Sequence, residues 1–338
     1  MGNAAGVRHY FIEAFTPYGY VSLLSELLKD IRYTYLLTGG PGTGKSTMMK
    51  LIGIQLIDRG YEVDYIRSIR EPDSVAGIFL PSYRIALLDK NEFKWGFEFS
   101  GGYVREIDFT SFCRKSKLEE YRDQITVLEH QLADIEQQII HQLREDYLGK
   151  QDNAIERESM APILTGSEMN QSNKNLEDSG CFDEIAIILS KVKSSNLSLF
   201  FLHGLQLDSW FNLVPRYIKD FDRICLDSEE SSDVMSILLE EVKSLGQRMD
   251  IIVHPLKPYT VIGLVFPEKN LAVWKGNPCR IEEQGFQLKH SPTLVEIMEN
   301  SKIARFKLKN VINDTLNFRG LDNFRGELIS SILSDLQN

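Results

Sequence analysis

Residues 33–59 read YTYLLTGGPGTGKSTMMKLIGIQLIDR, and this stretch predicts a strand, a glycine-rich turn and a helix in succession. The apolar, β-prone residues 33–38 form the expected strand, and residues 46–59 follow the spacing of an amphipathic helix. Between them, residues 39–46 match the phosphate-binding loop pattern G-x-x-x-x-G-K-[S/T] in full. A strand that leads through such a loop into a helix is typical of α/β proteins that bind the phosphates of a nucleotide.

Each residue type in the loop suits contact with a triphosphate. Glycine allows positive φ and a close approach of the backbone to phosphate, and proline stiffens the turn. We expect Lys45 to place its ammonium on the β- and γ-phosphates and Ser46 to place its hydroxyl on Mg²⁺. The predicted nucleotide-binding residues are Gly39, Gly40, Pro41, Gly42, Thr43, Gly44, Lys45, Ser46 and Thr47.

The composition of the 338 residues is that of a globular protein, with 43% hydrophobic and 25% charged residues. The length allows two domains of ordinary size. A net charge of −10 provides no excess of basic residues to neutralise phosphates, which argues against general nucleic-acid binding. A local basic patch is still compatible with this charge. The four cysteines form no C-x-x-C pair and the six histidines do not cluster, so we expect reduced thiols and no structural zinc. Neither a signal peptide nor an apolar run of membrane-spanning length is present, which favours a cytoplasmic location.

The chain contains an internal repeat. With a shift of 186 positions, residues 48–91 align without a gap with residues 234–277, and ten of the 44 pairs are identical, among them Asp64 and Asp250. Average residue usage would give roughly three identities. The segments before the loop align at a shift near 190, and the difference between the shifts falls in the loop itself. There the second copy, 226–233, has no glycine or lysine and several carboxylates, which would repel a triphosphate.

The repeat also helps to predict a second metal ligand. Residues 85–89 read IALLD, and an aspartate that ends an apolar strand beside the loop is expected to help hold Mg²⁺. The second copy has Lys275 at the position of Asp89, so the aspartate is lost together with the loop. We therefore predict Ser46 and Asp89 as the metal-site residues, with a solvated strand-end carboxylate as the alternative interpretation of Asp89.

Two acidic residues after the next predicted strand, Glu71 and Asp73, are candidates for positioning an attacking water. Arg67 and Arg70 are weaker candidates for contact with a γ-phosphate. The predicted catalytic residues are Lys45, Asp89, Glu71 and Asp73.

The order of predicted elements divides the chain into four parts. Each copy of the repeat reads as strand, loop, helix, strand and strand, which predicts an open α/β sheet of short parallel strands. Residues 118–147 predict a long helix with a heptad seam that must face another helix. Its predicted partner is 182–192, in an antiparallel hairpin with a polar, mobile tip at 148–180. A partner protein or self-association through this arm, 118–192, is the alternative. The expected parts are 1–116 (nucleotide-binding unit), 117–195 (helical hairpin arm), 196–292 (degenerate repeat) and 293–338 (C-terminal helical segment).

Together these features resemble a family of bacterial tandem P-loop ATPase-like proteins, found mainly in Firmicutes. The likeness spans nearly the whole chain, although the phosphate loop is its one specific motif. Family members often keep the loop in both halves and follow the strand-end aspartate with Gly-Thr-Ala-Pro-His, whereas here Lys90-Asn91-Glu92 follows Asp89. The resemblance implies ATP binding and supplies no physiological substrate. It is carried by residues 8–11 (RHYF), 16–20 (TPYGY), 39–47, 59–63 (RGYEV), 72–74 (PDS) and 85–89.

The sequence thus predicts an Mg²⁺- and ATP-binding protein with one active and one degenerate α/β unit, most simply a slow ATPase. A small-molecule kinase is one alternative. A nucleotide-gated switch or scaffold that acts through the helical arm is another. GTP is a weaker expectation because no Asn-Lys-x-Asp motif is present.

Overall fold

The computed structural model describes residues 7–93, 102–148, 197–226, 234–235, 237–239, 248–287 and 289–337. The predicted helix 182–192, the predicted polar tip and the acidic segment 227–233 lie outside these residues. None of the helices in the described ranges is long and apolar enough to cross a membrane.

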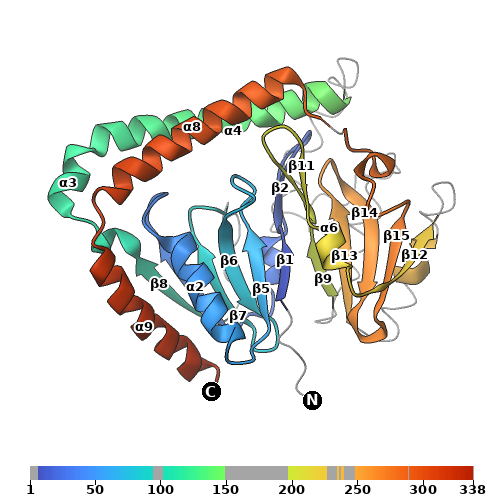
Figure 1. The fold of residues 1–338 in the computed structure, drawn as a ribbon, viewed down its shortest axis with the longest axis horizontal. Helices are drawn as coiled ribbons and strands as arrows, with labels where there is room; N and C mark the ends of the chain where they lie inside the picture. Colours follow the sequence, from blue (N-terminus) through green and yellow to red (C-terminus); the bar gives the residue numbers. More distant parts are fainter. Residues whose placement is uncertain are drawn as a thin grey trace, which may run out of the picture.

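A six-stranded sheet forms the core of the first half (Figure 1). β4 pairs in parallel with both β7 and β8, so the loop that follows β4 begins in the interior of the sheet. Helix α2 (Lys45–Ile57) packs on β5, β6 and β7, and its Met49, Ile52 and Leu56 are fully buried. In spatial order the strands are β1 (Val7–Tyr10), β5 (Val63–Arg67), β6 (Val75–Leu80), β7 (Ile85–Asp89), β4 (Tyr33–Thr38) and β8 (Tyr103–Asp108).

The prediction of parallel strands alone is wrong for β6, which is antiparallel to both of its neighbours, β5 and β7. The chain between these strands is short, residues 68–74 and 81–84. A connection of this length can close a hairpin, whereas a parallel pair needs a crossover of about a dozen residues or more. The sheet is therefore mixed, within an α/β fold.

The second half has a five-stranded sheet whose strand order repeats that of the first. Starting from β9, it corresponds strand for strand to β1-β5-β6-β7-β4. The register also repeats, since Asp64 pairs with Phe79 and Asp250 with Val265. The aligned sequence segments thus form equivalent strands. These strands are β9 (Leu197–Phe200), β13 (Met249–His254), β14 (Lys257–Phe266), β15 (Leu271–Lys275) and β12 (Asp222–Leu226).

The smaller elements follow the same correspondence. Met235, in the helical residues 234–235, is buried like its counterpart Met49 in α2. The hairpin of β2 and β3 and helix α1 in the first half correspond to the hairpin of β10 and β11 and helix α6 in the second. These elements are β2 (Glu13–Thr16), β3 (Gly19–Ser22), α1 (Leu24–Leu27), β10 (His203–Leu205), β11 (Trp210–Asn212) and α6 (Val214–Tyr217), with 3₁₀ turns η1 (Phe109–Phe112), η2 (Pro267–Lys269) and η3 (Ile281–Gln284).

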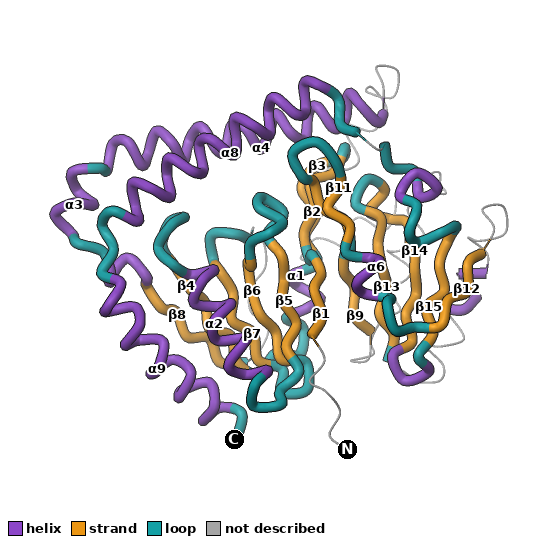
Figure 2. The backbone as a smooth tube through the Cα atoms, in the orientation of Figure 1, coloured by secondary structure: helices purple, strands orange, loops and turns teal. Residues whose placement is uncertain are grey.

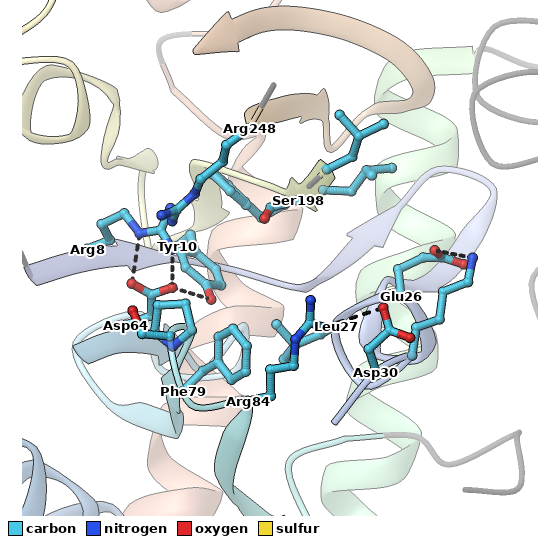
Figure 3. A pocket seen from close by; sticks show the side chains of 16 residues that line it. Arg8, Tyr10, Glu26, Leu27, Asp30, Asp64, Phe79, Arg84, Ser198 and Arg248 are labelled. Carbon is cyan, nitrogen blue, oxygen red and sulfur yellow. Dashed lines mark hydrogen bonds and ion pairs between the residues drawn. The ribbon is translucent and has the colours of Figure 1, made fainter. Parts of the chain in front are cut away.

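Repeat-equivalent residues meet where the two halves join. The backbones of Phe11 and Phe201 exchange two hydrogen bonds, of 2.9 and 2.7 Å, as expected for residues related by an approximate twofold axis. Close by, Arg8 donates to Asp64 at 2.8 Å and forms an ion pair with Asp250 at 3.2 Å; Figure 3 shows the bonds to Asp64. One arginine therefore neutralises both buried carboxylates of the repeat, which gives Asp64 and Asp250 a structural role.

In the described part of the chain, α3 (Lys115–Glu120) and α4 (Arg122–Leu148) follow the first sheet. Helices α8 (Pro292–Asn313) and α9 (Phe318–Asp335) follow the second. Helices α4 and α8 lie side by side and antiparallel (Figures 1 and 2). Ser291 bonds Asp146 at one end of the pair, and Lys117 bonds Asp314 at the other. Leu128, Leu132, Ile135 and Ile139 of the predicted seam are buried, and α8 packs along α4. The predicted partner, 182–192, lies outside the described residues.

The C-terminal helical segment consists of two helices, α8 and α9. The chain breaks between α8 and α9, where Asn317 caps α9 by accepting a hydrogen bond from the Gly320 N–H. Helix α9 then packs along α2 and η1, and Phe324 contacts Phe109 and Phe112. The C-terminal segment thus packs on the first half of the chain.

Candidate nucleotide-binding site

The phosphate-binding loop lies at the carboxyl end of β4 and leads directly into α2, as predicted. Gly39, Gly42 and Gly44 have φ of 113°, 91° and 91°, a region that glycine adopts without steric cost. Gly44 is the N-cap of α2. Because the first N–H groups of a helix have no acceptor within it, loop and helix together form a concavity suited to an anion.

Lys45 lies inside this loop and is 3% exposed. Its ammonium donates to the carbonyl oxygens of Gly39 and Gly40, the latter at 2.8 Å, and to Thr43 Oγ1 at 3.2 Å. Its Nζ is also 3.5 Å from Asp89 Oδ2. The lysine is therefore held at the centre of the concavity, where phosphate oxygens would be strong alternative acceptors.

Asp89 reaches the loop because β7 pairs in parallel with β4 and places Asp89 opposite Leu37. The pKa of Asp89 is raised to about 7, mainly by burial and also by the nearby Glu92, against the opposing effect of Lys45. The cost of removing the carboxylate from water thus outweighs its attraction to the ammonium.

Six of the nine predicted loop residues and both predicted metal ligands line one cavity of about 300 Å³, which we call the nucleotide cavity. Within it, the Ser46 hydroxyl bonds the Ser74 hydroxyl at 2.8 Å and accepts from the Val75 N–H at 3.2 Å. Hydroxyl and carboxylate oxygens are the ligands that Mg²⁺ prefers, so Ser46 and Asp89 fit this metal. The described residues contain no cluster of three or more His, Cys, Asp or Glu side chains placed to hold a metal, and a magnesium ion bound largely through phosphate oxygens needs none. The cavity is lined by Pro41, Gly42, Gly44, Lys45, Ser46, Thr47, Lys50, Glu71, Ser74, Val75, Asp89, Glu92, Arg305, Lys309 and Asn313.

The structure brings Glu71 into this cavity, but it does not bring Asp73 there. The Glu71 carboxylate forms an ion pair with Lys309. Asp73 is exposed, and its backbone carbonyl accepts from Lys50 and Arg67 at 3.2 and 3.1 Å. Of the two candidates for positioning water, only Glu71 therefore lines the cavity that contains Lys45 and Ser46.

The arginine candidates lie outside the cavity as well. Arg67 is held at the Asp73 carbonyl, and Arg70 binds Glu136 of α4 at 2.5 Å. Arg70 instead lines two adjoining cavities, of about 190 and 440 Å³.

Sequence analysis missed the residues that α8 adds to the site. Arg305, Lys309 and Asn313 recur every four residues, a spacing that places them on one face of the helix, and all three line the nucleotide cavity. The helix lies so close that a Cβ on Gly42 would be 2.8 Å from the Lys309 Cα. The fourfold spacing is visible in the sequence, but nothing local to α8 indicates that this face meets the loop.

No protein-family model matches the chain, and no curated protein or solved structure matches it either. The functional interpretation therefore rests on the residues of the site.

Proposed function

We propose that this protein binds ATP with Mg²⁺ in its first half and hydrolyses it slowly. In this proposal both halves are P-loop NTPase-like units, of which the second has lost its nucleotide site. The supporting observation is that a complete phosphate-binding loop folds around a buried Lys45, with Ser46 and Asp89 on the same cavity. A chance match to the motif would not require a strand-end carboxylate 3.5 Å from the lysine.

Each residue has a role in this proposal. Lys45 and the loop N–H groups hold the β- and γ-phosphates, while Ser46 and Asp89 hold the metal. The bound metal would neutralise charge on the phosphate oxygens. The Glu71 carboxylate orients a water and accepts its proton at a carboxylate oxygen.

Slow turnover is expected because the carboxylates near the loop, Glu71 and Glu92, are already bonded to other side chains. Glu71 is ion-paired with Lys309, and Glu92 accepts from the Ser68 hydroxyl at 2.5 Å and lies 3.8 Å from Arg70. These bonds occupy carboxylate oxygens that would otherwise be open to an attacking water. The residue after Asp89 is Lys90, so no second acid follows the strand.

Calorimetry with ATP, ADP and GTP in the presence of Mg²⁺, combined with a phosphate-release assay, tests the proposal. We expect Lys45→Ala to weaken ATP binding by about tenfold to a hundredfold, the value of one or two charge-assisted hydrogen bonds. Lys307→Ala is the matched control, because Lys307 is exposed on α8. Unchanged ATP affinity in a folded Lys45→Ala variant would contradict the site assignment.

Asp89→Asn tests the metal site separately. We expect this variant to lose the dependence of ATP affinity on Mg²⁺ because the amide is a poorer ligand for the ion. An unaltered Mg²⁺ dependence would assign the metal to other residues.

A small-molecule phosphotransferase is the second candidate, and a second cavity favours it. This cavity, of about 440 Å³, shares Lys50, Glu71 and Ser74 with the nucleotide cavity and has the size of a small-molecule site. Its lining combines apolar residues, such as Ile69 and Met298, with basic ones. Transfer of labelled phosphate from ATP to a metabolite in a mixed panel would support a kinase, whereas release of inorganic phosphate alone would support hydrolysis.

A protein partner at the α4–α8 pair remains a further proposal. Val127 of α4 and Ile303 and Phe306 of α8 are 65%, 52% and 65% exposed. Light scattering with and without ATP would show whether these helices mediate self-association.

A further inference from the structure

Helix α8 follows the sheet of the second half, yet it lines the nucleotide cavity of the first half. Its Lys309 backbone lies against Gly42, and the side chains of Arg305 and Lys309 extend the cavity beyond the loop. The loop thus meets cations that are more than 250 positions away in the chain.

Arg305 is a buried cation with incomplete hydrogen bonding. It is 5% exposed, and one terminal nitrogen lies 3.3 Å from Glu136 Oε1, while its Nε has no hydrogen-bond partner among the described residues. The same Glu136 oxygen accepts a shorter bond, of 2.5 Å, from Arg70. A buried guanidinium that shares an already engaged carboxylate is poorly compensated for its loss of hydration.

The position of Arg305 suits a phosphate ligand. It lines the nucleotide cavity and both adjoining cavities, and so lies at the point where all three meet. A guanidinium presents several N–H donors in a planar fork that matches phosphate oxygens. Lys309, one turn further on the same face, adds an ammonium at the Glu71 carboxylate.

We infer that Arg305 and Lys309 bind the γ-phosphate of the nucleotide, so that the half without a phosphate loop completes the site of the half that has one. This inference rests on the proposed binding of ATP. The inference also gives the second half a function, because α8, which carries both cations, directly follows the five-stranded sheet of that half. ADP lacks the group that these residues contact, so they would make the site selective for the triphosphate.

The ratio of ATP to ADP affinity, measured by calorimetry with Mg²⁺, tests this inference. In Arg305→Gln we expect ATP affinity to fall about tenfold to a hundredfold and ADP affinity to stay within about twofold, because one or two charge-assisted bonds to the γ-phosphate are lost. Lys309→Gln should lower the ratio in the same direction. Lys307→Gln, an exposed position on the same helix, should leave it unchanged.

Glu136→Gln gives the opposite perturbation because it weakens the existing hold on Arg305. We expect the ATP-to-ADP ratio of this variant to equal or exceed that of the wild type. Circular dichroism would establish that each variant is folded, and if Arg305→Gln is not, Lys309→Gln decides the matter.

The outcomes are distinguishable from failure of the proposed function. If the wild type binds neither nucleotide, the proposed function is wrong, and this inference falls with it. If the wild type binds both nucleotides equally, or if folded Arg305→Gln and Lys309→Gln keep the wild-type ratio, only the γ-phosphate contact is wrong.

Discussion

Replacing Gly42 with alanine tests how closely α8 lies against the phosphate-binding loop. Gly42 has a φ of 91°, and a Cβ at this position would be 2.8 Å from both the Cα and the carbonyl oxygen of Lys309. These are backbone atoms of a helix, so they cannot rotate away. The helix or the loop would have to move by about 0.6 Å to reach ordinary contact at 3.4 Å.

Two costs add up in the Gly42→Ala variant. A left-handed conformation costs an alanine about 1–2 kcal/mol. Insertion of a methyl group into a packed contact costs about 1–3 kcal/mol more. We therefore expect the free energy of unfolding to fall by about 2–5 kcal/mol.

Gly60→Ala is the matched control. Gly60 has a nearly identical φ of 88°, but an added Cβ there would meet no atom of the described residues within 4 Å. This variant should lose only the conformational part, about 1–2 kcal/mol. Urea unfolding without nucleotide, followed by circular dichroism, measures both variants. Equal losses in the two variants would refute the close contact of α8 with the loop.

Three further predictions concern other parts of the molecule. Arg8→Met should lower the free energy of unfolding by about 3–5 kcal/mol in urea titrations, because it leaves the buried Asp64 and Asp250 without their shared cation; a loss under 1 kcal/mol would contradict this role. Burial lowers the pKa of His203 from 6.5 to about 3, so the unfolded chain takes up a proton below pH 6.5 that the folded chain does not. The stability contributed by this neutral histidine is therefore complete above pH 6.5 and is lost as the pH falls towards 3. When the pH is lowered from 7 to 5, the free energy of unfolding of His203→Phe should fall by about 2 kcal/mol less than that of the wild type. Glu71→Gln should slow phosphate release about a hundredfold and retain ATP binding, and a larger effect of Asp73→Asn would reverse the assignment of the water-positioning residue.

The loop and the repeat could be predicted from the sequence because both depend on local order. The residues from Gly39 to Thr47 are contiguous, and their glycines and lysine have the same geometric use wherever the strand and helix flank them. The aligned halves likewise form equivalent strands in equivalent register, and the position of Asp89 beside the loop follows from this order.

Other features depended on information that local patterns do not contain. The predicted direction of β6 was wrong because alternation of apolar residues identifies a strand without giving its orientation. The orientation follows here from the short connections to β5 and β7. The heptad seam of α4 showed that the helix needs an apolar partner. It did not show which one, and α8 covers the seam from more than 150 positions away in the chain.

The sequence by itself determined the glycine-rich loop between a strand and a helix, and the duplicated sheet. Only the tertiary structure decided that α8 lies on that loop, that Glu71 rather than Asp73 lines the cavity, and that Arg305 and Lys309 complete it. The physical reason is the range of the interactions. Strand, turn and helix signals act over a few residues, whereas the packing of α8 depends on how apolar faces from both halves are buried together.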